Sequence, residues 1–473
     1  MTRVIDPLER PDEQMLFDRP GFGYSFAMSN EDVRRFDVAV IGAGSGGELA
    51  ATLLAKGSRA RRPMTVVVFE PSLVGGECPF VACIPSKVLL ARAQEPNPDW
   101  SAAIARRDKV TLGRDDASHA KELQDSGATL IRARATITGP HQVSAAGVDY
   151  QVDHIVVATG AAPNNLRDIQ FPEGLWTSSD AMSTMELPRS MVIVGGGPIG
   201  CELSEVYARF GTTVTIVEMS DILLKDVEPE ISSAMEVHLE GLGVIVALSA
   251  DLTAISGSDE GYIVEVKGRE PIACARVLVA IGKTPRLAGI GLEALGLDPR
   301  EVKVDNTGRL GGIDRLWAVG DVTALAPYTH GANSQASVVV DNIAGGTRSI
   351  HAAVMPRCVY THPPVAAVGP TLMAAETSAL AVVRVSYADI ARPTTDELGD
   401  GLLTVFADRE TGAVVGASGI GRSMDEIISQ ITLAIETKWP VSRLQHVVQP
   451  FPTISQLVGH AFELLATELL RSC

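Results

Sequence analysis

Short apolar runs, glycine-rich turns and stretches of helical periodicity alternate along this chain. The runs at residues 36–41 and 190–194 read as buried parallel strands, because most of their positions are apolar. Each run leads into a glycine-rich turn, a helical stretch and a further apolar run, at residues 65–69 and 213–217. This repeated order predicts two α/β units, each built on a parallel sheet.

The first glycine-rich turn has the form Gly-x-Gly-x-x-Gly, with Gly42, Gly44 and Gly47. Such glycines allow a tight turn and the close approach of a pyrophosphate, which the N-terminus of the following helix faces. Glu70 ends the next strand and can accept hydrogen bonds from ribose hydroxyls. The glycines alone are weak evidence, but the strand before them and the acid after them predict a dinucleotide site.

The second turn repeats the signal with Gly195, Gly197 and Gly200, and its acid is Glu218. A carboxylate here pairs with a ribose 2′-hydroxyl and repels a 2′-phosphate. Residues 219–224 contain no arginine or lysine to hold that phosphate, so we expect NADH rather than NADPH. A third apolar run, at residues 316–322, can return the chain to the first site.

Two cysteines, Cys78 and Cys83, follow the first turn closely. A regular helix would hold their Cα atoms roughly 8–9 Å apart, whereas a disulfide needs about 4.4–6.8 Å. Pro79 suits the first helical position, so we expect Cys78 to lie just outside the helix, and Pro85 to disturb the helix further. The pair alone fits a reactive dithiol, a structural disulfide or two buried thiols.

Composition narrows the class of protein. A chain of 473 residues with 46% hydrophobic content can form several domains with large cores. The net charge of −17 argues against nucleic acid or an anionic membrane as a partner, and no apolar run is long enough to span a bilayer. Only one cysteine pair is closely spaced, which does not indicate a secreted disulfide framework. We therefore expect a cytoplasmic protein.

Residues 1–35 precede the first unit and contain seven acids and five arginines without an apolar core, unlike a signal or transit peptide. The segment is either a tail or a piece docked on the folded body.

Taken together, these features resemble the flavoprotein disulfide reductases, which include dihydrolipoamide dehydrogenase, glutathione reductase and mercuric reductase. The resemblance runs from about residue 36 to residue 455. It is carried by the two glycine fingerprints, the cysteine motif with Pro85-Ser86-Lys87, Ala158-Thr159-Gly160, Glu202, Gly282-Lys283-x-Pro285, Gly320-Asp321 and residues 356–363.

The resemblance implies FAD at the first site and NAD(P)H at the second. Cys83 would face the flavin and Cys78 would meet the substrate, while Lys87 and Glu202 would form an ion pair near the reactive edge of the flavin. No metal is implied. The cofactor-binding residues that it implies beyond the two fingerprints and their acids are Gly76, Thr159, Gly160, Gly282, Asp321, which would hold the ribityl chain, and His330, which opens a helix facing the flavin.

The same resemblance implies an α/β fold with two Rossmann-like dinucleotide-binding domains, one for FAD and one for NAD, and a C-terminal α+β dimerisation domain of a homodimer. The boundaries we expect are 1–35 for the extension, 36–186 and 311–349 for the FAD domain, 187–310 for the NAD(P) domain, and 350–473 for dimerisation.

The chain departs from the family near its C-terminus. The family's disulfide reductases carry a His–Glu dyad for proton transfer, and the matching positions here are Phe451 and Gln456. General acid–base catalysis is typically worth 10²–10⁴-fold, so efficient disulfide reduction is in doubt. Phe80 and Phe451 either line an apolar acceptor pocket or fill the core, and His460, or His446, could replace the missing base.

We therefore predict an FAD-dependent NADH oxidoreductase that passes electrons through Cys78 and Cys83 to a small-molecule acceptor, either quinone-like or an atypical disulfide. Three alternatives remain open. The chain could be a dithiol oxidase acting on a small-molecule thiol, or a redox-sensing or electron-transfer flavoprotein with a protein partner. It could also be a mercuric-type metal reductase, although those enzymes use a C-terminal cysteine pair and this chain ends in the single Cys473.

Overall fold

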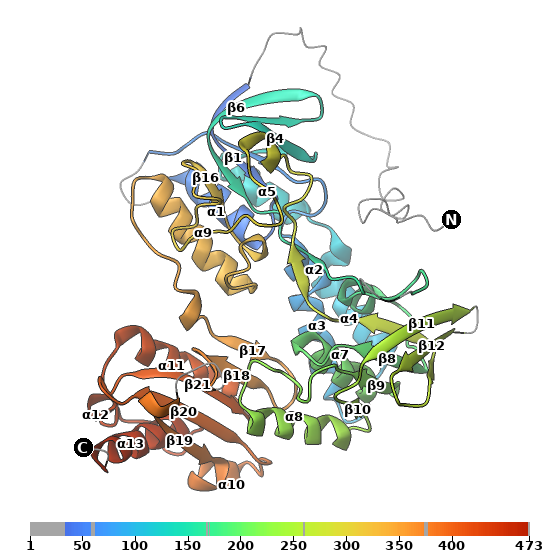
Figure 1. Cartoon of the computed structure of the whole chain (residues 1–473), viewed down its shortest axis with the longest axis vertical. Coiled ribbons are helices and arrows are strands. Elements are labelled where there is room, and N and C mark those ends of the chain that lie inside the picture. Colours follow the sequence, from blue (N-terminus) through green and yellow to red (C-terminus); the bar gives the residue numbers. More distant parts are fainter. Residues whose placement is uncertain are drawn as a thin grey trace.

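The computed structural model describes residues 34–57, 62–166, 169, 171–258, 261–372 and 377–471. Figure 1 shows three parts: a first α/β unit, a second α/β unit containing β8 to β12, and a C-terminal unit containing β17 to β21. The predicted fold class is confirmed by this arrangement. The predicted extension lies outside the described residues except for Arg34 and Arg35, and Cys473 also lies outside them.

The first unit is built on a seven-stranded sheet. Its parallel strands, in spatial order, are β3 (Thr129–Ile131), β2 (Val66–Phe69), β1 (Arg34–Ile41), β6 (Val148–Val157) and β16 (Leu316–Ala318). β5 (Gln142–Ala145) and β4 (Ala135–Gly139) continue the sheet as antiparallel strands from the other end of β6. The pairing of β16 with β6 confirms that the third apolar run returns the chain to the first sheet.

Two helices, α1 (Ser45–Lys56) and α9 (Thr329–Ile343), cover one face of this sheet and pack against each other. In the chain, α1 precedes the second α/β unit and α9 follows it. The N-termini of both helices therefore belong to the same sheet, although nearly three hundred residues separate them.

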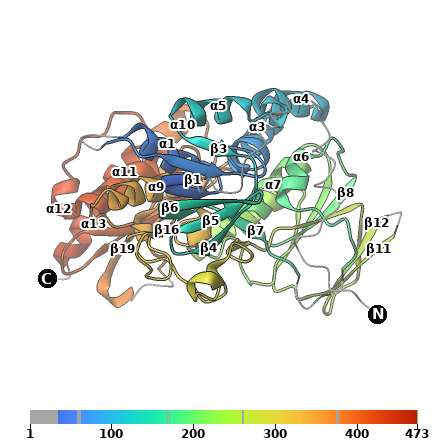
Figure 2. The same ribbon diagram turned by 90° about the horizontal axis from the view of Figure 1, so that it is seen from above.

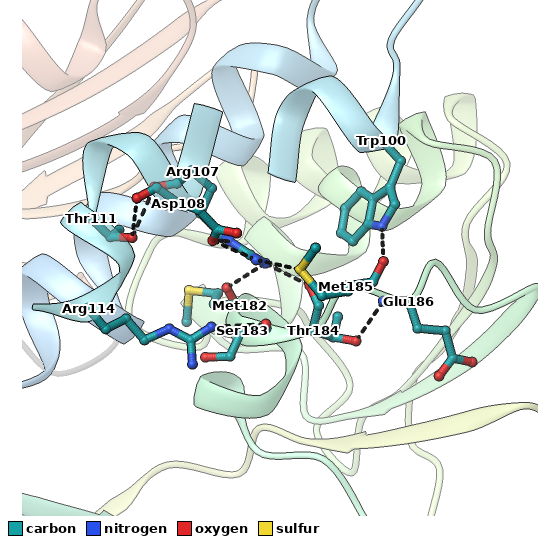
Figure 3. A network of polar contacts seen from close by, with 10 residues as sticks. All are labelled: Trp100, Arg107, Asp108, Thr111, Arg114, Met182, Ser183, Thr184, Met185 and Glu186. Carbon is teal, nitrogen blue, oxygen red and sulfur yellow. Dashed lines mark hydrogen bonds and ion pairs between the residues drawn. The ribbon is translucent and has the colours of Figure 1, made fainter. Parts of the chain in front are cut away.

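Between β2 and β3 the chain forms a layer of helices: α2 (Glu77–Val81), α3 (Cys83–Ala93), α4 (Trp100–Val110), the short 3₁₀ helix η2 (Leu112–Arg114) and α5 (Ala117–Asp125). Figure 3 shows how α4 is fixed to the connector that leads into the second unit. Arg107 is 1% exposed, and its guanidinium donates to the carbonyls of Met182 and Thr184 at 3.1 and 2.7 Å. Asp108 balances its charge at 2.8 Å, which makes this buried arginine tolerable.

The second unit has a four-stranded parallel sheet with the order β10 (Ile245–Ala247), β9 (Thr213–Val217), β8 (Ser190–Val194) and β14 (Arg276–Val279). Its helices are α7 (Pro198–Arg209) and α8 (Pro229–Gly241), and α6 (Ser178–Ser183) precedes the sheet. A separate antiparallel sheet contains β11 (Leu252–Ser258), β12 (Gly261–Val266) and β13 (Ile272–Cys274). The four strands predicted from the two repeated patterns are all present.

The chain crosses between the two units at a short antiparallel pair, β7 (Ala161–Pro163) and β15 (Lys283–Pro285). After β15, the side chains of Leu287, Ile290 and Leu292 pack in the core of the first sheet, and η3 (Leu292–Leu295) lies there too. Before β8, Leu166 and Ala181 already pack with the second sheet. The packing thus places the crossings near residues 163 and 285, earlier than the expected boundaries at 186 and 310.

The C-terminal unit is a five-stranded antiparallel sheet with the order β17 (Arg357–Val359), β18 (Val365–Val368), β21 (Val414–Ile420), β20 (Leu402–Asp408) and β19 (Leu380–Ser386). Its helices are α10 (Arg392–Thr395), α11 (Met424–Thr437), α12 (Val441–Leu444) and α13 (Gln456–Arg471). Viewed from above in Figure 2, this unit and the second α/β unit flank the first sheet. Among the described residues, no helix combines the length and apolar character needed to cross a bilayer.

Candidate functional site

The two cysteines lie on either side of a break between α2 and α3. Ala82 adopts φ −137° and ψ −100°, which ends α2 and allows α3 to begin at Cys83. Cys78 is the second residue of α2, so the expectation that it lies just outside a helix beginning at Pro79 was wrong. Pro85 is in the first turn of α3, where a missing N–H breaks no intrahelical hydrogen bond. The break at Ala82, rather than either proline, brings the two thiols together.

Both thiols are free and partly buried, and their pKa values diverge. A hydrogen bond from Cys78 lowers the pKa of Cys83 to about 6, against the opposing effect of burial. The hydroxyl of Thr329, 3.4 Å from the Cys83 sulfur, and the charge of Lys87 act in the same direction. The same hydrogen bond raises the pKa of Cys78, which therefore keeps its proton. The position of Cys83 at the start of α3 also favours a thiolate.

One turn beyond Cys83, the structure forms the expected pair between α3 and α7. The Nζ atom of Lys87 lies 2.9 and 3.1 Å from the two carboxylate oxygens of Glu202. The backbone N–H of Tyr360, just after β17, donates to the same carboxylate at 3.0 Å. The Tyr360 ring also lies 4.4 Å from Nζ, in a cation–π contact. All three units therefore meet at this ion pair.

The first glycine fingerprint has the shape of a dinucleotide cradle. A Cβ atom on Gly42 would come 2.4 Å from the carbonyl oxygen of Ala158, and one on Gly47 would come 2.1 Å from the Gly42 oxygen. One on Gly76 would come 2.8 Å from the Cα atom of Gly44. By contrast, a Cβ atom on Gly44 would meet no atom nearer than 4.0 Å. Gly44 is the residue that caps the N-terminus of α1. The cradle therefore leaves room where a pyrophosphate would approach.

The second fingerprint repeats this geometry. A Cβ atom on Gly195 would come 2.5 Å from the Ala280 oxygen, and one on Gly200 would come 2.0 Å from the Gly195 oxygen. One on Gly197, the residue that caps α7, would meet nothing within 4 Å. In both turns, therefore, the first and third glycines leave no room for a side chain, whereas the second glycine, at the helix N-terminus, borders open space.

The two acids that follow the fingerprints make the same hydrogen bonds. Glu70 accepts the backbone N–H of Ala43 at 2.8 Å, and Glu218 accepts that of Gly196 at 2.6 Å. Each also accepts the N–H of the residue two positions after itself. Burial raises the pKa of Glu70, and these two backbone bonds oppose the rise. Each carboxylate is thus fixed at the rim of its own glycine turn, where a ribose would lie.

Further residues near the first glycine turn fit a large bound group. Asp321 opens the short helix η4 (Asp321–Thr323); burial raises its pKa, and the charge of Lys283 opposes the rise. Gln335 of α9 is fully buried and accepts the N–H of Gly320 at 2.7 Å. Its Nε2 atom has no hydrogen-bond partner within the described parts of the chain, so a buried donor remains free beside Asp321. Together with the glycine cradle, this donor set is suited to the nucleotide and ribityl groups of FAD.

His330 lies in the first turn of α9, as expected, and its side chain contacts the start of the C-terminal unit. It is the second residue of α9, and its Nε2 atom donates to the carbonyl oxygen of Pro356 at 2.8 Å. Its ring stacks on that of Tyr328. The N-terminus of α9 belongs to this site, and the side chain next to the dithiol is that of Thr329, which was not predicted to have a role.

Three other expected cofactor residues lie at the crossing between the units. The hydroxyl of Thr159 donates to the carbonyl oxygen of Arg286 at 2.6 Å, and the Gly160 carbonyl accepts the Arg286 N–H at 3.0 Å. Gly282 has φ +94° and accepts the N–H of Asn164 at 3.0 Å. Their hydrogen bonds join the segment around β7 to the segment around β15.

The two phenylalanines of the expected acceptor pocket differ in burial. Phe80 is 3% exposed and packs edge-on against His119, so it offers no open face. Phe451 is 75% exposed, in the loop between α12 and α13. Gln456 begins α13 and accepts the N–H of Thr453 at 3.3 Å. Within this chain, only Phe451 of the two rings is free to meet a ligand or another chain.

The possible replacement base, His460, lies one turn after Gln456 on α13, as predicted from the spacing. Its Nδ1 atom is 3.7 Å from a carboxylate oxygen of Glu463; the His460 side chain is partly exposed and that of Glu463 is exposed. The helix thus carries a His–Glu pair, although not at the positions of the family's dyad.

Comparison with known proteins agrees with this geometry. Residues 36–355 match the family model described as pyridine nucleotide-disulphide oxidoreductase, and residues 355–462 match the dimerisation domain of that family. A dihydrolipoyl dehydrogenase from Chlorobaculum parvum is 32% identical, with 92% of this chain and 97% of that protein covered. A mercuric reductase from Streptomyces lividans is 28% identical, with coverages of 93% and 98%.

Among solved structures, the fold matches a Cu(II) complex of the HOCl-induced flavoprotein disulfide reductase RclA from Escherichia coli. The TM-score is 0.83 and the identity 26%, and the match covers 91% of this chain and 100% of that one.

Proposed function

The chain belongs to the pyridine nucleotide-disulphide oxidoreductase family, and on that premise we propose that it is an NADH-dependent flavoenzyme that reduces a small-molecule acceptor through Cys78 and Cys83. Members of this family are oxidoreductases that use FAD and a pyridine nucleotide. Bound FAD supplies the redox chemistry that connects the nucleotide with the dithiol. The match of residues 355–462 to the dimerisation domain supports a homodimer.

The observation that carries the proposal is the unequal thiol pair beside Lys87 and Glu202. Two electrons and one proton convert a Cys78–Cys83 disulfide into the Cys78 thiol and the Cys83 thiolate. The structure suits that product, because Cys78 holds the proton and donates it in a hydrogen bond to Cys83. The hydroxyl of Thr329 further stabilises the thiolate.

Glu218 supports NADH as the reductant. Its carboxylate is held at the rim of the second glycine turn, and no arginine or lysine occurs at residues 219–224. A 2′-phosphate would therefore meet negative charge without a compensating cation.

The C-terminal segment indicates the chemical class of the acceptor. Phe451 and Gln456 stand where the family's disulfide reductases have their proton-transfer dyad. A disulfide acceptor releases a thiolate that must be protonated, whereas a quinone has no leaving group and can take its two protons from solvent. The exposed Phe451 ring also suits an aromatic acceptor. We therefore propose a quinone-like acceptor.

The test is NADH consumption with quinones, glutathione disulfide and lipoamide, in wild type, Cys78→Ser and His460→Ala. His446→Ala tests the other candidate base, and His351→Ala is the matched control, because exposed His351 also lies near a glutamate, 3.6 Å from Glu436. Quinone reduction should exceed disulfide reduction by about 100-fold or more. A quinone can also take electrons directly from the reduced flavin, so Cys78→Ser should keep much of the quinone reduction. Rapid disulfide reduction that is lost in His460→Ala or in His446→Ala, but not in His351→Ala, would contradict the proposal and would identify the replacement base.

A further inference from the structure

Helix α7 contacts the start of the C-terminal unit through two acids, and the mechanism above uses only one of them. Glu202 accepts the backbone N–H of Tyr360 at 3.0 Å, and Glu205 accepts that of His362 at 2.9 Å. The acids are one helical turn apart, and the two amides are alternate residues of the segment that follows β17. The helix therefore holds residues 360–362 at two points.

Glu205 is 0% exposed, which is unusual for a carboxylate. Besides the His362 N–H, it accepts hydrogen bonds from Gln94 Nε2 at 2.8 Å and from Arg209 Nε at 2.9 Å, and it contacts His238 Nε2 at 3.1 Å. The Nδ1 atom of His362 is 3.9 Å away. The buried carboxylate therefore has hydrogen-bond donors and a guanidinium beside it that compensate for its removal from water.

The carboxylate is ionised in this environment. Burial alone would raise its pKa, but the hydrogen bonds from His238 and the His362 backbone, with the charges of His238 and Arg209, hold the pKa of Glu205 below its ordinary value. Its hydrogen bonds to backbone and side chains are therefore charge-assisted, which makes them stronger than neutral ones.

The contacts of Glu205 join the C-terminal end of α3, helices α7 and α8, and the segment that follows β17. Gln94 directly follows α3, whose first turn carries Cys83. His238 belongs to α8, and Arg209 ends α7. Loss of the carboxylate would release residue 362, and with it the segment that places the Tyr360 ring against Lys87 and the Tyr360 N–H on Glu202.

We propose that Glu205 is a positioning residue, which acts through residues 360–362 to keep Tyr360 in contact with the Lys87–Glu202 pair. The role of that pair in the reaction rests on the proposed function, but the anchoring of the segment does not. The test therefore measures the two separately.

The first measurement is backbone hydrogen exchange, by mass spectrometry, of the peptide covering residues 360–362. It compares Glu205→Leu, which removes the acceptor, with Glu205→Gln, which keeps a carbonyl oxygen. Glu228→Leu is the matched control, because Glu228 is also buried and accepts an N–H of the C-terminal unit, that of Leu372 at 3.1 Å. Exchange should accelerate about tenfold or more in Glu205→Leu, clearly less in Glu205→Gln, and not in Glu228→Leu. Unchanged exchange in Glu205→Leu, or equal acceleration in all three, overturns the proposal.

The second measurement uses the FAD-loaded Cys78→Ser protein, in which the Cys83 thiolate should give a long-wavelength absorption band with oxidised flavin. Adding Glu205→Leu should raise the pH midpoint of that band by about half a unit or more, because Lys87 loses its fixed position. Adding Glu228→Leu should leave the midpoint in place. Accelerated exchange with an unmoved midpoint would overturn the positioning role. Absence of the band in the Cys78→Ser parent would instead contradict the proposed function, while accelerated exchange would still support the anchor.

Discussion

The ammonium of Lys87 lies 2.9 Å from the carboxylate of Glu202, and this contact joins the helix that begins at Cys83 to the helix that begins at the second glycine fingerprint. The residues are 115 positions apart in the chain. The pair therefore forms only when the two nucleotide units are packed together, and it places a positive charge one helical turn from the Cys83 thiolate.

Removing that charge should weaken the thiolate. We expect Lys87→Met to raise the pKa of Cys83 by about one unit, because the lysine is one of the groups that lower it. The measurement is the pH midpoint of the long-wavelength band in the FAD-loaded Cys78→Ser protein. Lys121→Met, which removes an exposed lysine of α5, should not move the midpoint. A midpoint unchanged in Lys87→Met would show that the ion pair does not act on Cys83.

The thiolate itself should titrate in a defined range. The pKa of Cys83 is lowered to about 6, so the thiolate persists above that pH and is lost as the pH falls through about 6. A Cys78→Ser variant keeps a hydrogen-bond donor, whereas Cys78→Ala removes it, so the band should disappear at higher pH in Cys78→Ala. Equal midpoints in the two variants would mean that the Cys78–Cys83 hydrogen bond does not set the pKa.

Nucleotide preference should follow from one carboxylate. Wild type should use NADH with a kcat/KM at least about tenfold above that for NADPH, a difference of roughly 1.4 kcal/mol. The double change Glu218→Ala with Ser220→Arg should reverse the preference, because it removes the negative charge and adds a cation for the 2′-phosphate. Glu240→Ala, an exposed acid of α8, should have no effect. Steady-state kinetics that show equal use of both nucleotides by wild type would refute this assignment.

The two arginines of Figure 3 should contribute very differently to stability. Arg107 is buried and binds two carbonyl oxygens, so Arg107→Leu leaves both acceptors and Asp108 without a partner and should cost about 3 kcal/mol or more. Arg114 is exposed and, among the residues that the structure describes, donates to the Ser183 carbonyl, so Arg114→Leu should cost about 1 kcal/mol or less. Thermal and denaturant unfolding of the two variants would reveal the difference, and equal losses would contradict it.

The features that could be predicted from sequence are those encoded within a few residues. Each glycine turn needs its small residues because atoms of the same turn, or of the adjoining strand, would otherwise collide, and this requirement is visible at Gly42 and Gly47. The Lys87–Glu202 pair was expected only through the family resemblance, since nothing in either local sequence points to the other. Thr329, Tyr360 and Glu205 were missed as parts of the site, because a hydroxyl or a backbone amide has no local signature until tertiary packing assigns its partner.

The errors have equally physical reasons. The helix break was assigned to prolines, yet Ala82 takes the non-helical conformation. The strands β7 and β15, where the chain crosses between the two units, were not predicted, because each has three residues and is too short to show a period. Phe80 and Phe451 are chemically identical, and only the fold decides that one is buried and the other exposed.

The central claim is that electrons from the nucleotide reach the Cys78–Cys83 pair. The most direct test is anaerobic titration of the FAD-loaded protein with NADH while the visible spectrum and the number of free thiols are followed. The account predicts a long-wavelength band from the Cys83 thiolate, with two new thiols per chain, and loss of the band in Cys83→Ser. A wild-type protein that shows neither the band nor a reducible pair would contradict it.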